Sequence, residues 1–151
     1  MTTKSSGFTL IELLVVVGIL GILAAVGLVS YSGYVEGSKR KTAENVLMQL
    51  ALGQTEYYAD FNSFYKADNC TRGGAKGTTT TDVSSDNIEE FLLGGMDSIT
   101  PEMGYNFCAG SDPGGSNFML FAVERDAANP CIISMEANNK FVRLRKDGTD
   151  C

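Results

Sequence analysis

The sequence contains no histidine, and this absence excludes several classes of site. A catalytic triad with a histidine base, a histidine-based zinc protease motif and an imidazole metal cage are all impossible without it. There is also no pair of cysteines with C-x-x-C spacing and no glycine-rich phosphate-binding motif after a strand. We therefore expect a protein that is not an enzyme, with no cofactor and no metal centre.

Basic residues are scarce as well. The chain has 12 lysines and arginines against 18 acidic residues, for a net charge of −6. Such an acidic balance gives no general reason to expect nucleic acid as the main partner. With 151 residues, the chain has room for one soluble domain in addition to one membrane helix.

Charge is nearly missing from one long segment near the start. Between Phe8 and Val29 the only charged residue is Glu12. A helix of that length covers about 33 Å, enough to cross the hydrocarbon of a bilayer. A carboxylate inside that layer costs about 2.5–3.5 kcal/mol at the helix centre and less near the interface, so such residues usually have a partner. The sequence predicts a membrane-spanning helix with one functional charge.

The residues Gly7-Phe8-Thr9-Leu10-Ile11-Glu12 follow a short polar leader, MTTKSSG. This arrangement resembles the class III signal of type IV prepilins, without a gap to about Tyr34 and more loosely to Tyr65. The segment RKTAENVLMQLALGQTEYYADFNSFY is also similar to pilins, including PilE-like minor pilins. A secretory signal differs, because its cleavage site follows the apolar stretch.

The resemblance implies a set of roles for these residues. Prepilin peptidase would cut between Gly7 and Phe8 and methylate the new amino group of Phe8. Glu12 would pair with the Phe8 amine of a neighbouring subunit during assembly. Loss of the leader removes Lys4, which leaves 11 basic residues against 18 acids and a net charge of −7. In many pilins a proline stands about where Val29 stands here.

All four cysteines, Cys70, Cys108, Cys131 and Cys151, follow the apolar segment. With no histidine and no C-x-x-C spacing, two disulfides in an oxidising compartment explain them better than zinc or a catalytic thiol. Three pairings are possible. Because many pilins close their last loop with a disulfide, the resemblance favours Cys131–Cys151, which leaves Cys70–Cys108.

The membrane orientation receives conflicting signals. Lys4 precedes the apolar segment, whereas Lys39, Arg40 and Lys41 closely follow it. A count of positive charges would place the C-terminal side in the cytoplasm. The leader and the cysteines indicate the opposite, and we expect a cytoplasmic N-terminus.

Beyond Tyr34 the pattern becomes amphipathic. Apolar residues recur at helical spacing from Ala43 to Phe61, so we expect one helix from about Phe8 to Asp60 whose second half lies on a sheet. Residues about 66–95 form a loop that contains a short helix opened by Asp86, with Glu89 three residues later. β-rich runs at 105–109, 118–125, 131–136 and 140–146 predict an antiparallel sheet.

The last β-rich run carries the one local feature compatible with DNA or a surface. Alternation predicts that Val142 and Leu144 point inward, and that Phe141, Arg143 and Arg145 form an outward stripe beside Lys146. Arginines can contact phosphates and an aromatic ring can stack on bases. The simpler interpretation is a charged edge strand that discourages unwanted strand pairing. Asp147 and Asp150 could likewise bind calcium, but paired carboxylates in a turn are more often solvated.

Together these patterns predict an α+β protein with the type IV pilin fold. We expect a cleaved leader at residues 1–7, a transmembrane and filament-core helix at 8–34, and a head at 35–151 with its sheet at about 103–146. The resemblance implies a pilus subunit for adhesion, twitching motility or DNA uptake. It would partner other pilins, prepilin peptidase and the assembly machinery, first in the inner membrane of a Gram-negative bacterium and then outside the cell. The alternatives are a type II secretion pseudopilin, a minor or tip pilin that binds DNA or a surface, and an anchored protein that never polymerises.

Overall fold

The computed structural model describes residues 7–67, 70, 82–111, 116–125 and 127–151. It divides into two compact units, residues 1–38 and residues 39–151. The expected leader up to residue 6, and positions 68, 69 and 71–81 of the expected loop, lie outside the described residues.

Helix α1 runs from Leu10 to Phe61, within two residues of the expected bounds. In the first unit, every described side chain from Phe8 to Gly27 is exposed. The helix is long and apolar enough in this part to cross a membrane. Leucine, isoleucine and valine side chains left exposed in this way require lipid or protein around them.

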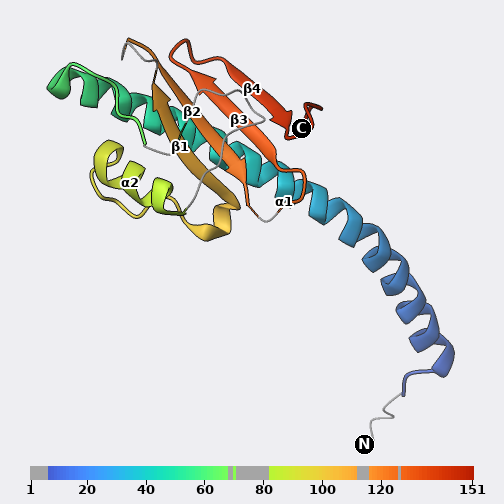
Figure 1. Ribbon diagram of the computed structural model, residues 1–151. Coiled ribbons are helices and arrows are strands. Elements are labelled where there is room, and N and C mark those ends of the chain that lie inside the picture. The colour runs from blue at the N-terminus through green and yellow to red at the C-terminus, as the bar shows by residue number, and fades with distance from the viewer. Residues whose placement is uncertain (1–6, 68–69, 71–81, 112–115, 126) are drawn as a thin grey trace, which may run out of the picture. The chain divides into compact units, whose positions relative to one another are not determined.

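The second unit contains a four-stranded antiparallel sheet (Figure 1). Its strands are β1 (Tyr105–Ser111), β2 (Phe118–Glu124), β3 (Cys131–Glu136) and β4 (Phe141–Arg145), in the order β1-β2-β3-β4. Each strand pairs with the next along the chain, as the short connections predict. The turn between β3 and β4 uses Asn139 at φ 58, a conformation that asparagine tolerates.

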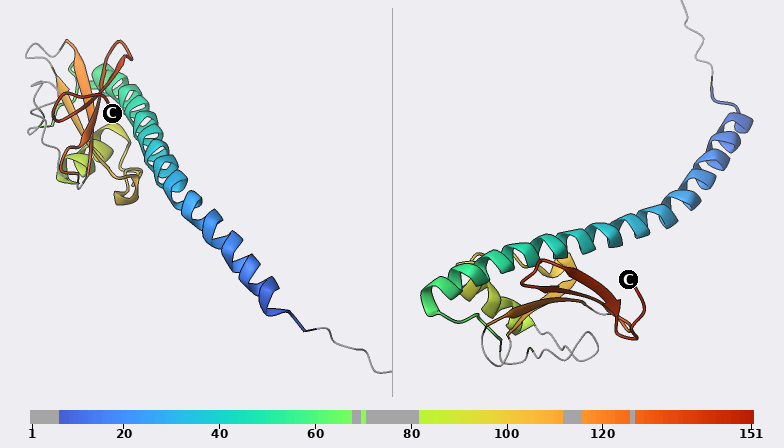
Figure 2. Two further views of the ribbon diagram at one scale, coloured as in Figure 1. Left: turned by 90° about the vertical axis from the view of Figure 1, so that its right-hand side faces the viewer. Right: turned by 90° about the horizontal axis from the view of Figure 1, so that it is seen from above.

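Residues 39–61 of α1 run along one face of the sheet (Figure 2). The apolar stripe of this half is buried, with Ala43, Leu47 and Leu50 at 0% exposure. Gln54 is also fully buried, and its side-chain amide both donates to the carbonyl of Tyr65 and accepts from its N–H. These two bonds hold the chain where it turns back after α1.

The strand register shows which side chains share the face toward α1. Phe107, Ala122, Ile133 and Arg143 are aligned across the four strands, so their side chains lie on one face. Arg143 bonds Glu44 of α1. The expected orientation of β4 is therefore wrong: Phe141 and Arg143 face α1, and Val142 is 41% exposed.

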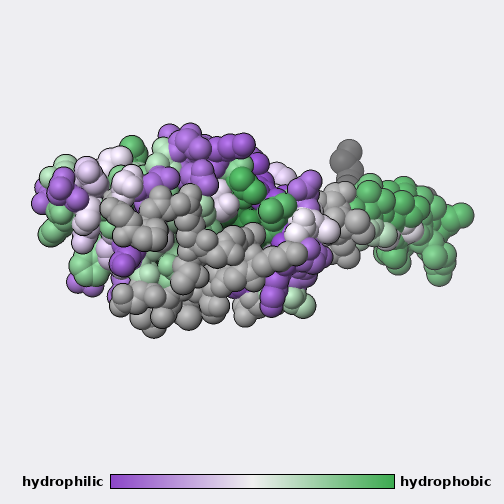
Figure 3. Space-filling view, turned by 45° about the horizontal axis from the view of Figure 1, so that its top comes forward, coloured by the Kyte–Doolittle hydropathy of each residue, from purple (hydrophilic) through white to green (hydrophobic). Residues whose placement is uncertain are grey.

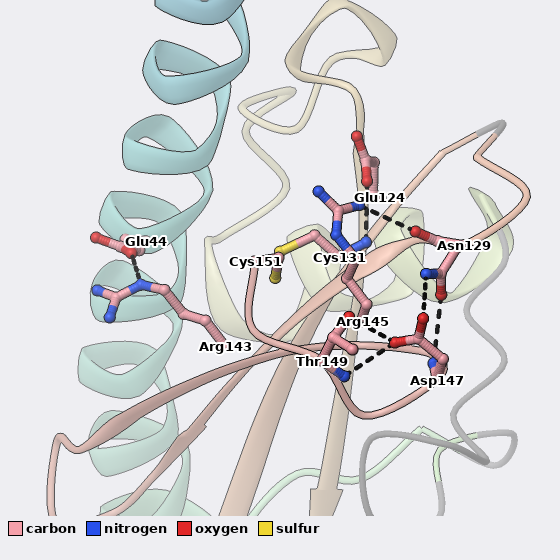
Figure 4. Close-up of a disulfide and its surroundings, with 9 residues drawn as sticks. All are labelled: Glu44, Glu124, Asn129, Cys131, Arg143, Arg145, Asp147, Thr149 and Cys151. Carbon is pink, nitrogen blue, oxygen red and sulfur yellow. Dashed lines mark hydrogen bonds and ion pairs between the residues drawn. A yellow bond between two sulfur atoms is a disulfide. The ribbon is translucent and has the colours of Figure 1, made fainter.

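Glu44 and Arg143 join the edge strand β4 to α1 (Figure 4). The Glu44 side chain is 8% exposed and also accepts a hydrogen bond from Lys41 at 2.9 Å. Burial alone would raise the pKa of Glu44, but the hydrogen bonds and charges of Arg143 and Lys41 outweigh it and lower that pKa. The pKa of Arg143 is raised, chiefly by its hydrogen bond to Glu44.

Helix α2 (Asp82–Leu92) begins four residues before the expected start at Asp86. Glu89 does not serve a cap at Asp86, because its carboxylate accepts hydrogen bonds from the N–H groups of Ser98 and Ile99. It thus orders the segment after α2. The end of α2 approaches α1 at Gly53, where an added Cβ would collide with the carbonyl oxygen of Leu92.

Gly53→Ala should therefore destabilise the second unit by about 1–3 kcal/mol, because a backbone atom cannot give way as a side-chain tip can. Thermal unfolding of the full chain in detergent, followed by circular dichroism, measures this loss. The control is Gly37→Ala, where nothing lies within 4 Å of the added methyl group and helix propensity improves. Equal melting temperatures for Gly53→Ala and the parent would contradict the close approach.

Glu44→Gln should lower the free energy of unfolding by about 1.5–2 kcal/mol at pH 7, the lower part of the range for a charged hydrogen bond. The lower part applies because the Arg143 side chain is 38% exposed and water screens it. The pKa of Glu44 is depressed in the folded state, so its stabilisation is complete above the unfolded pKa of about 4.3 and is lost as pH falls through the folded pKa.

Denaturant unfolding of the parent and of Glu44→Gln at pH 7 and at pH 3 checks this pH dependence. The difference between their free energies of unfolding should be smaller at pH 3 than at pH 7. The exposed residue Glu90 provides the control, since Glu90→Gln should change stability by less than about 0.5 kcal/mol. A difference in free energy of unfolding that stays constant or increases toward pH 3 would show that Glu44 does not stabilise the fold as a carboxylate.

Candidate functional site

The N-terminal segment presents the expected processing site openly. Gly7 and Phe8 precede α1 and lie outside any helix or strand, and Phe8 is 83% exposed. In the part of α1 that follows, up to residue 27, the visible surface is mostly hydrophobic (Figure 3). A peptidase acting here would meet an exposed peptide bond shortly before the helix, which begins at Leu10.

Thr9 and Glu12 form a capping box at the start of α1. The Glu12 carboxylate oxygen Oε2 accepts hydrogen bonds from the Thr9 N–H at 2.9 Å and from the Thr9 hydroxyl at 2.7 Å. The Thr9 hydroxyl oxygen in turn accepts from the Glu12 N–H at 3.3 Å. The N–H groups of Thr9 and Glu12 are thereby both satisfied, as in a capping box. The sequence already carried the T-x-x-E spacing that indicates this box.

The capping box leaves one carboxylate oxygen of Glu12 able to accept further hydrogen bonds. Both bonds from Thr9 end on Oε2, so within the described residues Oε1 keeps its lone pairs. The box uses residues 9–12 alone, and a cut between Gly7 and Phe8 leaves it intact. The carboxylate is thus oriented at the end of the helix, where the helix dipole favours negative charge.

The four cysteines form two disulfides in the structure. Cys70 joins Cys108, with Cα atoms 5.9 Å apart, and Cys131 joins Cys151, with Cα atoms 5.7 Å apart. These are the pairs that the resemblance implies. The second disulfide attaches the last residue of the chain to the first residue of β3, and so closes the segment after β4.

The C-terminal segment folds back on β4 before it reaches Cys151 (Figure 4). Arg145 donates its backbone N–H to the Thr149 carbonyl, and Leu144 pairs with Asp150. Asp147 accepts hydrogen bonds from the N–H and hydroxyl of Thr149 and from the side chain of Asn129. The bonds from Thr149, followed by that from Asn129, lower the pKa of Asp147.

These contacts give Asp147 a structural role. Its two carboxylate oxygens serve Thr149 and Asn129, and no group of metal-binding side chains occurs in the part of the chain that the structure describes. Asp147 thereby connects the final turn to the segment between β2 and β3.

The expected outward stripe of Phe141, Arg143 and Arg145 does not form. Phe141 packs on the core, Arg143 pairs with Glu44, and Arg145 donates to the carbonyl of Asn129. Lys146 is exposed beyond the strand end. Both arginines therefore bind groups of their own chain, Glu44 and the carbonyl of Asn129.

Three residues with clear roles were missed in the sequence. Thr9 could have been found from its spacing to Glu12. Glu44 and Asn129 carried no such signal, because their partners lie 99 and 18 positions away. Only the folded chain brings these groups together.

Comparisons with known proteins agree with the geometry of the N-terminal segment. Residues 2–28 match the family model of the prokaryotic N-terminal methylation motif. The chain is 43% identical over 67 residues to a fimbrial protein, EcpC, of Eikenella corrodens, covering 44% of this chain and 43% of the relative. It is 41% identical over 83 residues to the type IV major pilin PilE of Neisseria gonorrhoeae, covering 52% and 47%.

A fimbrial protein of Neisseria meningitidis serogroup B aligns further, with 33% identity over 114 residues, 62% of this chain and 64% of the relative. The chain spans about half the length of the other two relatives. No solved structure matches it significantly. The methylation motif, the similarity to fimbrial proteins and type IV major pilins, and the long helix followed by an antiparallel sheet together support a type IV pilin.

Proposed function

We propose that this protein is a structural subunit of a type IV pilus, assembled through its N-terminal helix. The prepilin motif at residues 2–28 is the observation that carries the proposal. Prepilin peptidase removes the leader between Gly7 and Phe8 and methylates Phe8. The mature chain then keeps its apolar helix, first in lipid and later among other subunits.

Charge supports the role of Glu12. Cleavage creates an ammonium group on Phe8 beside the positive end of the helix dipole, which is unfavourable for that charge. Glu12 carries a carboxylate at nearly the same depth, held by Thr9 with Oε1 still able to accept. When a neighbouring subunit supplies its Phe8 amine, two charges that are costly in apolar surroundings neutralise each other.

The cell compartment follows from the same proposal. The subunit spans the inner membrane once with a cytoplasmic N-terminus, and its head, with both disulfides, lies on the oxidising side. Its partners are other pilins, prepilin peptidase and the membrane assembly machinery. The matched relatives include proteins named as major pilins, which favours a filament subunit over a secretion pseudopilin. Abundance in filaments distinguishes a major from a minor pilin.

Replacement of the carboxylate tests the assembly contact. Glu12→Val should leave the amount of subunit in the membrane unchanged and reduce sheared surface filaments by about tenfold or more. Tenfold corresponds to about 1.4 kcal/mol, less than the cost of an unpaired charge in the membrane. Thr9→Val, which removes the hydroxyl and keeps the Thr9 N–H, should have a smaller effect.

Quantitative blotting of membrane and sheared fractions provides the measurement. Glu90→Gln makes an equal change of charge on the exposed side of α2 and serves as the control, with filament yield expected to equal that of the parent. Normal filament yield from Glu12→Val would refute the proposed contact. A parallel loss from both fractions would mean that Glu12 acts in insertion or stability instead.

A further inference from the structure

A hollow lies between the last turns of α1 and the end of α2, within the second unit. Its volume is about 440 Å³, within the range of small-molecule sites. Two kinds of side chain dominate its polar and aromatic lining: the rings of Tyr57, Phe61 and Phe91, and the carboxylates of Glu56 and Asp60. No lysine or arginine lines it among the described residues.

The aromatic rings belong to a continuous run. Phe61 stacks on Tyr57 with ring centroids 4.4 Å apart, Tyr57 meets the edge of Tyr65 at 5.6 Å, and Tyr65 stacks on Phe91 at 5.1 Å. The two terminal rings each give one face to a neighbour yet remain 63% and 51% exposed, respectively. Large aromatic rings left open at both ends of a packed run provide negative π faces to a ligand.

The two carboxylates lie one helical turn apart. Glu56 and Asp60 are both exposed on α1, and like charges at this spacing repel each other. Within the part of the chain that the structure describes, no hydrogen bond or ion pair joins either of them to a cation. A positive ligand in the hollow would relieve this repulsion and meet the ring faces at the same time.

We propose that this hollow binds a small organic cation of the quaternary ammonium class, such as a choline head group. A quaternary ammonium spreads its charge over methyl groups and has no N–H to donate, so aromatic faces and nearby carboxylates are its suitable surroundings. A metal ion, in contrast, requires several oxygen ligands at fixed distances. This site is independent of the filament contact at Glu12, because it lies in the second unit.

Methionine methyl groups report on this site directly. Met96 lines the hollow, whereas Met135 is fully buried elsewhere in the core. In the full chain with ¹³C-methyl methionine, solubilised in a maltoside detergent to avoid choline head groups, titration with choline should shift the Met96 signal saturably. The Met135 signal should stay in place. Because the monomer is used, the result does not depend on filament assembly.

The neutral isostere 3,3-dimethylbutan-1-ol separates charge recognition from simple apolar contact. It has the same shape as choline with carbon in place of nitrogen, and should bind at least about tenfold more weakly. Phe61→Leu and Asp60→Asn should each weaken choline binding about threefold or more. Glu136→Gln, an equal change of charge on β3, should not alter it.

Equal binding of choline and its isostere would overturn the proposal, as would the absence of a saturable Met96 shift. Unchanged affinity in both Phe61→Leu and Asp60→Asn would also overturn it. The chemical shift of the Met135 methyl signal in each variant shows whether the core is still folded. A shift of Met96 that Glu136→Gln weakens equally would indicate general attraction to an acidic protein and would likewise refute the site.

Discussion

A helix whose side chains are almost all apolar must be removed from water, and this constraint governs the whole chain. From Phe8 to Gly27 the described side chains are exposed in the isolated subunit, which is a state that only lipid or other proteins can relieve. The one charge there, Glu12, is held at the first turn by Thr9. The segment therefore has two favourable environments, a bilayer before assembly and a bundle of like helices afterwards. In the proposed filament, Glu12 gains a cationic partner that the bilayer does not supply.

In the second unit, the apolar side chains of α1 are buried against the protein's own sheet. Residues 43–54 of α1 bury their stripe on the sheet, so the helix closes one face of the head. The edge strand β4 is held to it by the Glu44–Arg143 pair, and the chain end is held by the Cys131–Cys151 disulfide. Edge strands left open invite pairing with other chains. Here the C-terminal segment returns along β4 through the Leu144–Asp150 bridge, which covers part of that edge.

Long, strongly periodic features were predictable from sequence, and features decided by distant contacts were not. Helix α1 and the four antiparallel strands follow from local patterns, and the processing motif follows from the resemblance to prepilins. The predicted orientation of β4 was wrong because both sets of alternating side chains on this strand contain apolar residues. Glu44, which lies 99 residues before Arg143, binds its side chain on the side that faces α1. The predicted start of α2 at Asp86 was wrong because Glu89 does not complete a capping box there. Its carboxylate instead accepts hydrogen bonds from the N–H groups of Ser98 and Ile99. In both cases a charged side chain binds a partner that the local sequence pattern did not identify.

We expect the helix to begin the mature protein, with a cut immediately before Phe8. Mass spectrometry of the N-terminal peptide from sheared surface filaments measures where the cut lies. The expected peptide begins at Phe8 and carries one methyl group on its amine. A filament protein that retains Met1 to Gly7, or one cut on the far side of the apolar segment, would contradict it.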